Sequence, residues 1–352
     1  MNGGGLKQAE TKSSHEPTVS VCIANYNGLG FIDECINSVR NQDCEFFVEI
    51  IIHDDASTDG SAQHILATYP EVVLIQSTEN VGFCVANNRM AVASHGKFLL
   101  LLNNDAVLFP DSLRILYQEG EHLSIPAILS LPQYNYEGGE LIDCGCLLDP
   151  FCNPVPNLDL SRKHVAMVIG ACMWIPKCLW DDLGGFPDWF GSLAEDMYLC
   201  CYTRLMDYPV LALNRSGYRH RVGESLGGGK VTSDKRLVTS LRRRSLSERN
   251  KTFVMILTYP TSLLLVVLPV HLLVLATEGI LLLFIKRDYR LWHEVYKSCF
   301  TSLWHEFKRL AATRTVVQAR REISLIRWLS EFTILPHKLR LLFRHGMPEV
   351  KR

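Results

Sequence analysis

Asp105 stands where two apolar runs meet, a position at which a carboxylate can hold a metal ion. The apolar run 98–102 is followed by Asn103, Asn104 and Asp105, and a second apolar run begins directly after Asp105. A carboxylate between two buried runs is costly unless it has a partner. Because ligands of open α/β sheets bind at the carboxyl ends of the strands, Asp105 is a candidate ligand for a metal ion that carries phosphates. A polar turn between two strands is the alternative interpretation.

Two other acidic pairs stand where predicted elements end or begin. Asp54 and Asp55 directly follow the second apolar run of the chain. Asp54 lies at the strand end itself and is harder to explain as a helix cap than Asp59 is. Glu195 and Asp196 begin a predicted helix, where the helix dipole alone would favour carboxylates. The position of this second pair therefore does not by itself indicate a function.

Short apolar runs alternate with helical periodicity along the first half of the chain. The runs predict strands at 19–24, 46–52, 72–76, 98–102 and 106–109, and the periodic segments predict helices at 31–41, from near 60, through 87–90 and at 112–121. Strands that alternate with helices of this length imply a parallel sheet with right-handed crossovers. A G-x-G-x-x-G after the first strand and a Walker motif are both absent, so dinucleotide-binding and P-loop interpretations are weak.

The pattern becomes less regular after residue 130. Residues 130–165 are rich in Pro, Asn and Gly and are predicted to form loops or small strands that shape an acceptor site. The run 165–175 predicts a buried strand broken at Gly170. A short strand at 210–213 then leads to His220, and a lone histidine in a loop is more often structural than a ligand.

Composition narrows the class of protein. The 352 residues carry a net charge of −1 and are 47% hydrophobic, which gives no sign of wholesale disorder or of nucleic-acid binding. The 12 cysteines match no zinc pattern and no regular disulfide framework, so they read as thiols of a reducing compartment. Residues 1–17 lack the apolar core of a signal peptide and are predicted to be a short disordered leader. We therefore expect the body of the protein to lie in the cytosol.

Charge is distributed unevenly along the chain. Residues 286–352 carry 15 Lys and Arg against 6 Asp and Glu, whereas the whole chain carries 36 against 37. The body is therefore acidic and the tail basic. This arrangement predicts a tail that meets an anionic surface.

The apolar segment 253–285 has Glu278 as its single charged residue. As a helix it would extend roughly 50 Å, which exceeds the ~30 Å hydrocarbon core of a bilayer. Pro260 and Pro269 interrupt it. Both flanks are basic, and the positive-inside rule places both on the cytosolic side. This pattern favours a re-entrant or interfacial hairpin that turns near Pro269 over a single span, with a pair of soluble core helices as a further alternative.

A predicted amphipathic helix follows at 289–311. Its apolar stripe is rich in aromatic residues and has basic neighbours, which suits the headgroup layer of a membrane. Packing of the stripe on the rest of the protein is the alternative. The stripe comprises Trp292, Val295, Tyr296, Phe300, Leu303, Trp304, Phe307 and Leu310.

Six segments of the chain occur together in a familiar order. They are VSVCIANYNG, HDDASTDGS, ENVGFCVANNRMA, LLNNDAVLFPDSL, GGFPDWF followed by AEDMYLC, and YRHRVGES. From about Val19 to Ser225 the chain thereby resembles glycosyltransferase family 2, and most closely its bacterial rhamnosyltransferase-like members, which build surface polysaccharides. The resemblance implies an α/β domain of the GT-A type at 18–234, mainly a parallel sheet flanked by helices. A basic linker and a helical, membrane-associated region would follow at 235–352.

The resemblance also implies roles for single residues. Asp196 matches the general base, and Glu195 stands beside it. Asp105 matches the metal-binding acid and His220 a histidine that can complete this site, which would hold a divalent ion, Mn²⁺ or Mg²⁺. The positions that match donor-binding residues are Ala24, Tyr26, Asp54, Asp55, Asn88, Asn103 and Asn104, with Asp54 at the nucleobase.

Some positions depart from the pattern of the family. Tyr198 stands where a second acid is common, and Asn103-Asn104-Asp105 offers one carboxylate where a full D-x-D motif offers two. These departures imply weaker metal binding. The Q-x-x-R-W element of processive members is absent, which favours transfer of a single sugar.

The resemblance implies an inverting, metal-dependent hexosyltransferase on the cytosolic side of the inner membrane. It would move one sugar, with rhamnose as one candidate, from a UDP- or dTDP-linked donor to a lipid-linked glycan in cell-surface polysaccharide synthesis. Two alternatives stay open. One is a polyprenyl-phosphate sugar synthase, and the other is a non-catalytic membrane scaffold with a degenerate transferase fold.

Overall fold

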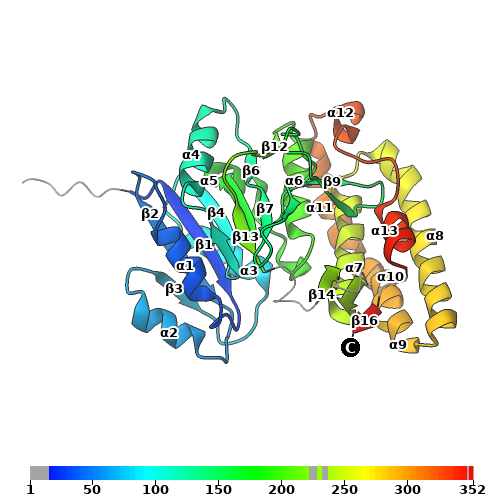
Figure 1. Cartoon of the computed structure of the whole chain (residues 1–352). Helices are drawn as coiled ribbons and strands as arrows, with labels where there is room; N and C mark the ends of the chain where they lie inside the picture. The colour runs from blue at the N-terminus through cyan, green and yellow to red at the C-terminus, as the bar shows by residue number, and fades with distance from the viewer. Residues whose placement is uncertain (1–15, 222–227, 232–236, 347–348, 352) are drawn as a thin grey trace, which may run out of the picture.

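A seven-stranded sheet forms the centre of the N-terminal part of the molecule (Figure 1). The computed structural model describes residues 16–221, 228–231, 237–346 and 349–351. Most of the predicted leader, residues 1–15, lies outside the described residues. The strand order is β12-β6-β11-β4-β1-β2-β3. The strands are β1 (Val19–Asn25), β2 (Val48–Asp54), β3 (Val73–Gln76), β4 (Phe98–Asn103), β6 (Ile128–Ser130), β11 (Cys172–Pro176) and β12 (Val210–Ala212).

The alternation of strands and helices in the first hundred residues is confirmed. Strands β1, β2, β3 and β4 are parallel to one another, and β1 and β4 are buried almost throughout. Unbroken apolar strands such as 98–102 therefore lie at the centre of the sheet, where both faces are covered by other elements. The helices of this part are α1 (Ile32–Arg40), α2 (Ser61–Thr68), α3 (Phe83–Ala93), α4 (Ser112–His122), α5 (Lys177–Leu183) and α6 (Glu195–Leu205).

The predicted strand over 165–175, broken at Gly170, is confirmed only after the break, and its first part is wrong. Strand β11 begins only at Cys172, and it runs antiparallel to β4. Residues 165–171 are buried but irregular, because Met167 makes only an isolated bridge to Cys146 and the backbone of Gly170 and Ala171 turns toward the end of β4. This irregular stretch becomes part of the candidate site below.

A second, four-stranded sheet packs at the end of β4. Its order is β5-β13-β7-β8, and its strands are β5 (Ala106–Leu108), β7 (Gln133–Asn135), β8 (Leu141–Asp143) and β13 (Tyr218–His220). Strands β9 (Cys146–Leu148) and β10 (Pro154–Pro156) form a hairpin beside it. The loop-rich region predicted at 130–165 is therefore built from short strands, as expected.

The C-terminal part is helical and lies to the right of the sheet in Figure 1. Helix α7 packs against α6 on one side and against α8, α10 and α11 on the other. The elements are β14 (Gly228–Val231), β15 (Leu237–Ser240), α7 (Leu241–Thr258), α8 (Thr261–Lys286), α9 (Tyr289–Leu291), a π-helical segment η2 (Trp292–Lys297), α10 (Ser298–His305), α11 (Phe307–Ala319), α12 (Leu325–Leu329), α13 (His337–His345) and β16 (Glu349–Lys351).

The predicted hairpin near Pro269 is wrong. Helix α8 continues through Pro269, and the chain turns instead at Tyr259 and Pro260, between α7 and α8. The apolar segment 253–285 is therefore divided between two environments. Residues 253–258 end α7 inside the core, whereas the following helix is largely exposed.

The predicted aromatic stripe over 289–311 is divided as well. Val295 and Tyr296 are fully buried beneath α7, and Leu310 of α11 is buried too. Trp304 and Phe307 point outward, and Trp304 is 82% exposed. The packing interpretation is therefore confirmed for the buried part of the stripe, and the membrane interpretation stays a prediction for the exposed part.

Candidate functional site

Asp105 lies directly after β4 with an unsatisfied carboxylate. Its side chain is 2% exposed, and neither carboxylate oxygen accepts a hydrogen bond from a residue that the structure describes. The nearest charged or polar partner is Nε2 of His220, 3.0 Å from Oδ1. Nδ2 of Asn103 lies 3.3 Å from the same Nε2. Oδ1 of Asp105 and Nδ2 of Asn103 thus both lie within hydrogen-bond reach of Nε2, and the tautomer of the imidazole decides whether Nε2 donates to Asp105 or accepts from Asn103.

This donor set fits a divalent cation. A buried carboxylate without hydrogen bonds is costly unless a cation neutralises it, and the imidazole nitrogen beside it is of a type that also ligates divalent metals. The described residues offer no group of three or more His, Cys, Asp or Glu side chains that could hold a metal ion. A cation at Asp105 and His220 would therefore need further oxygen ligands from phosphate groups and water.

Sheet pairing explains why these two residues meet, although 114 positions of sequence separate them. Strand β13 runs antiparallel to β5, with His220 opposite Ala106, and the backbone N–H of Arg221 donates to the carbonyl of Asp105 at 3.2 Å. This register places His220 beside Asp105, which directly precedes β5. The rest of the YRHRVGES segment, from 222, lies outside the described residues.

Glu195 and Asp196 begin α6, as predicted, and both are energetically unfavourable as anions. Oε2 of Glu195 has no hydrogen-bond partner among the described residues. Burial and the neighbouring carboxylate of Asp196 raise the pKa of Glu195 well above its usual range. Burial also raises the pKa of Asp196, although its carboxylate accepts hydrogen bonds from the backbone N–H groups of Gly170 (3.0 Å) and Met197 (2.7 Å).

Arg243 of α7 is the cation that acts on this pair. Burial lowers the pKa of its guanidinium, and the carboxylates of Asp196 and Glu195 oppose this shift. Arg243 is half-buried and makes no ion pair or side-chain hydrogen bond with the described residues. Sequence reasoning placed this arginine in a basic linker only.

The segment Gly170–Ala171 joins the two halves of the site. Gly170 donates its N–H to Oδ2 of Asp196, and the carbonyl of Ala171 accepts from the backbone N–H of Asn103 at 3.1 Å. Gly170 and Ala171, which directly precede β11, thus contact Asp196 at the start of α6 and Asn103 at the end of β4. The structure brings together Asn103, Asp105, Asp196 and His220, which the sequence places far apart.

Asp54 and Asp55 have roles in holding loops. Asp54 accepts from Nδ2 of Asn25 (2.8 Å) and from the backbone N–H of Ser57 (3.0 Å). Asp55 accepts from the backbone N–H groups of Val81 (2.7 Å) and Gly82 (2.9 Å), which fixes the entry to α3. Both carboxylates are buried, so each keeps only its remaining lone pairs for a ligand.

The other predicted donor-binding residues lie in different surroundings. Tyr26 is half-exposed beyond β1, and Ala24 packs partly buried against the core. Asn104 donates to Oδ1 of Asn25 at 2.9 Å. Asn88 lies elsewhere in the network, because its amide bonds Phe186 through both the carbonyl (2.8 Å) and the N–H (3.0 Å) and so ties α3 to the loop before α6.

Sequence reasoning missed Asn25. This fully buried amide donates to Asp54 and to Oγ of Ser61 (2.9 Å) and accepts from Asn104, so it joins the ends of β1, β2 and β4. A Cβ atom at Gly28 would come within 2.1 Å of Oδ1 of Asn25, which explains the glycine in this turn. The polar residue that directly ends the first apolar run was the available signal.

Residues 20–175 match the family model described as "Glycosyl transferase family 2". This domain belongs to glycosyltransferase family 2. The predicted family is thereby confirmed for the domain at residues 20–175, while the rhamnosyltransferase-like branch stays a prediction.

Curated relatives match this chain over only part of their own length. One is the putative teichuronic acid biosynthesis glycosyltransferase TuaG of Bacillus subtilis, 33% identical over 94 residues, which are 26% of this chain and 36% of TuaG. Another is the chondroitin synthase of Escherichia coli, 31% identical over 188 residues, which are 52% of this chain and 26% of the synthase. The chain thus spans well under half the length of these relatives.

Solved structures share the fold over most of the chain. The mannosyltransferase PcManGT of Pyrobaculum calidifontis, in complex with GDP-Man and Mn²⁺, aligns with a TM-score of 0.50 at 17% identity, over 87% of this chain and 88% of PcManGT. The 1–349 fragment of S. aureus TarS in complex with UDP-GlcNAc aligns with a TM-score of 0.52 at 17% identity, over 86% and 90%. The predicted GT-A fold is confirmed.

Proposed function

We propose that this protein is an inverting glycosyltransferase that moves one sugar from a nucleoside-diphosphate donor onto a hydroxyl group of a lipid-linked glycan in polysaccharide synthesis. One observation carries the proposal. The buried carboxylate of Asp105 accepts no hydrogen bond from the described residues and has Nε2 of His220 3.0 Å away, while the Gly170–Ala171 segment connects the end of β4 to Asp196. The names of relatives that act in teichuronic acid and chondroitin synthesis support a polysaccharide product.

Asp105 and His220 would hold the divalent ion, with Asn103 orienting the imidazole. When bound, such an ion acts as a Lewis acid that neutralises the charge of the diphosphate leaving group. The complexes of PcManGT with GDP-Man and Mn²⁺ and of TarS with UDP-GlcNAc support a donor of this class. UDP- and dTDP-linked sugars are the donors that we propose.

Asp196 is the proposed general base. An acceptor hydroxyl needs a carboxylate aligned to take its proton as it attacks, and a base whose pKa is raised toward neutrality accepts that proton more readily. Burial raises the pKa of Asp196, while two backbone N–H groups hold its carboxylate in a fixed orientation. One base with a single displacement gives inversion, in contrast to the carboxylate nucleophile of retaining glycosidases.

The C-terminal region supplies a surface for a membrane. In the part of the chain that the structure describes, α8 is the one helix long and apolar enough to span a bilayer, and it is 17% buried. Leu265, Leu273 and Phe284 of α8 are strongly exposed, as is Trp304 of α10. We propose that these side chains hold the protein on the cytosolic face of the inner membrane, where a lipid-linked acceptor lies.

Calorimetric titration of UDP and of dTDP into the detergent-purified full chain, with and without Mn²⁺, tests the donor site. We expect binding that requires Mn²⁺ and that is lost in Asp105→Ala and weakened at least tenfold in His220→Ala. Asp181→Asn, which changes an exposed carboxylate on α5, is the control and should bind as the wild type does. Binding to a folded Asp105→Ala variant at wild-type affinity would contradict the proposed site. Absence of binding by the wild type to any nucleotide would favour the scaffold alternative.

A further inference from the structure

The backbone directly before Glu195 is held in an unfavourable conformation. Leu193 and Ala194 have φ of 71° and 64°, and Gly191 has φ of 73°. Two successive residues with a Cβ atom in the left-handed region cost free energy, and such a conformation persists only where the surroundings hold it. The turn 190–194 sets the direction in which α6 begins and therefore the place of the two acids.

Asn250 of α7 holds this turn. Its side chain is 0% exposed, and its Nδ2 lies within hydrogen-bond distance of the carbonyls of Phe190 (3.1 Å), Ser192 (2.9 Å) and Leu193 (2.7 Å). These carbonyls converge because of the left-handed residues among them. The NH₂ group has two hydrogens and the Phe190 carbonyl also accepts from Arg249, so the carbonyls of Ser192 and Leu193 depend most on this amide.

Arg249 fixes the orientation of that amide. Its Nε donates to Oδ1 of Asn250 at 2.8 Å, and its Nη2 donates to the carbonyl of Phe190 at 2.8 Å. Because a guanidinium can only donate, Oδ1 must face Arg249, and the NH₂ group must then face the carbonyls of the turn. Neighbouring residues of α7 therefore act together on the segment before Glu195.

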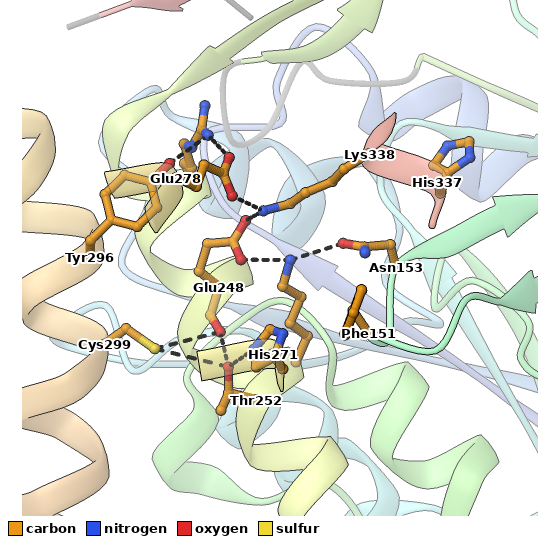
Figure 2. A network of polar contacts seen from close by, with 12 residues as sticks. Phe151, Asn153, Glu248, Thr252, His271, Glu278, Tyr296, Cys299, His337 and Lys338 are labelled. Atoms are coloured by element: carbon orange, nitrogen blue, oxygen red, sulfur yellow. Dashed lines mark hydrogen bonds and ion pairs between the residues drawn. The ribbon is translucent and has the colours of Figure 1, made fainter. Parts of the chain in front are cut away.

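The same turn of α7 makes a different set of contacts with α8 and α13, shown in Figure 2. Glu248 pairs with Lys251 and with Lys338 of α13, each at 2.6 Å. Oγ1 of Thr252 lies 2.8 Å from Nε2 of His271 in α8. Residues 248, 251 and 252 thus hold the C-terminal helices, whereas 249 and 250 hold the turn before α6. Thr252 is equally buried, and its hydroxyl bonds Glu248, His271 and Cys299 rather than any described residue of that turn, which makes it a matched control.

We propose that Asn250 is a positioning residue for the Glu195–Asp196 pair, acting through the turn 190–194 with its amide oriented by Arg249. This inference rests on the proposed function only in taking Glu195 and Asp196 as the catalytic acids. It assigns the helical C-terminal region, which lies outside the matched family domain, a part in building the active site.

Two measurements on the full chain test the proposal, one of them independent of activity. Hydrogen exchange of peptides covering 186–199 should rise at least tenfold in Asn250→Ala and stay near the wild-type rate in Thr252→Ala. Nucleotide release from UDP-GlcNAc, UDP-glucose, dTDP-rhamnose and GDP-mannose should show kcat at least tenfold lower in Asn250→Ala, with KM for the donor changed less than threefold. Arg249→Met, which keeps an apolar stem near Phe253, should shift both quantities in the same direction by a smaller factor.

The outcomes separate the two proposals. Wild-type exchange of 186–199 in a folded Asn250→Ala or Arg249→Met variant overturns the positioning role, whatever the activity. Equal loss of kcat in Asn250→Ala and Thr252→Ala also overturns it, because loss of stability would then explain both. If the wild type releases nucleotide from no donor while exchange rises only in the Asn250 and Arg249 variants, the proposed function fails and the structural role of Asn250 stands.

Discussion

Two buried carboxylate sites in this protein have opposite electrostatics. Glu195 lies beside another acid, its Oε2 has no partner among the described residues, and its pKa is raised by burial and by Asp196. Glu248 is as deeply buried, but Lys251 and Lys338 each lie 2.6 Å from its carboxylate. Burial raises the pKa of Glu248 and the two ammonium groups lower it, so that the pKa falls well below its usual range.

The difference supports the proposal that the pair at the start of α6, and not the site around Glu248, serves chemistry. The network around Glu248 is neutralised within the protein and joins three helices, which is what a structural site requires (Figure 2). The carboxylates at the start of α6 make no ion pair with the described residues, although the charge of Arg243 acts on them, and they follow a strained turn. Perturbed acids of this kind gather at functional sites, because a protein retains such a cost only where the group acts on a ligand.

The largest effect should come from Asp196→Asn. We expect kcat to fall by about 10²–10⁴, the usual contribution of a general base, while the melting temperature stays the same or rises, because the variant removes a buried negative charge. Nucleotide release by the detergent-solubilised chain, with a membrane lipid extract as acceptor, measures the rate. Asp181→Asn is the control. Undiminished transfer by Asp196→Asn would favour the polyprenyl-phosphate alternative, since a lipid phosphate acceptor needs no base.

Breaking the Glu248 network should instead affect stability. Lys251→Met removes one of two cations from a fully buried acid, and removal of one partner of a buried ion pair costs about 3–5 kcal/mol. Urea unfolding measures the loss. Lys177→Met breaks the exposed pair with Asp181 at 3.0 Å and should cost less than about 1 kcal/mol. Similar losses in the two variants would show that the network around Glu248 is not a structural site.

The two acids should respond to pH in opposite directions. The folded pKa of Glu248 is lowered, so its stabilisation is present above the unfolded value of about 4.3 and is lost as the pH falls below it. The folded pKa of Glu195 is raised, so its contribution is present below about 4.3 and is lost as the pH rises toward the folded pKa.

Melting temperatures of Glu248→Gln and Glu195→Gln from about pH 3 to about pH 8 test this contrast. Glu248→Gln should lie below the wild type at neutral pH, and the gap should narrow only as the pH falls below about 4.3. Glu195→Gln should lie at or above the wild type at pH 8, and this advantage should shrink as the pH falls. Parallel curves for the two variants would contradict the contrast between the sites.

The sequence predicted the parts of the site that local pattern determines. Asp105 and Glu195 were found because polar residues interrupt apolar runs or begin a periodic segment, and these signals depend only on neighbours in sequence. The role of Asn250 could not be predicted from local pattern, because its partners lie 57–60 positions away in the sequence. A polar residue in a basic stretch is normally interpreted as solvent-exposed.

Helix α8 is a second feature that local sequence pattern could not predict. Pro269 predicted a turn because proline removes a helical hydrogen bond and clashes with the preceding turn. Two residues later, His271 packs inward against Thr252, and Glu278 bonds Arg244 and Lys338. These contacts with α7 and α13 hold the second part of the helix in line with the first, so tertiary packing outweighs the local cost of the proline.

The smallest effect should come from Ala194→Gly, which tests whether the turn before the acids carries strain. Glycine adopts φ near 64° without the steric cost that alanine pays, although its unfolded chain is more flexible. We expect the free energy of unfolding to be unchanged or to rise by up to about 1 kcal/mol. Ala312→Gly in the exposed middle of α11 is the matched control and should lower it by about 1 kcal/mol.

The contrast between these two glycine variants bears directly on the two carboxylate sites. Among the described residues from 237 to 286, which contain Glu248, none has a positive φ, so the structural network stores no comparable strain. If urea unfolding shows the same loss for Ala194→Gly as for Ala312→Gly, the turn is relaxed. The free-energy cost at the start of α6 would then be electrostatic alone, and Asn250 would contact a turn that is stable without it.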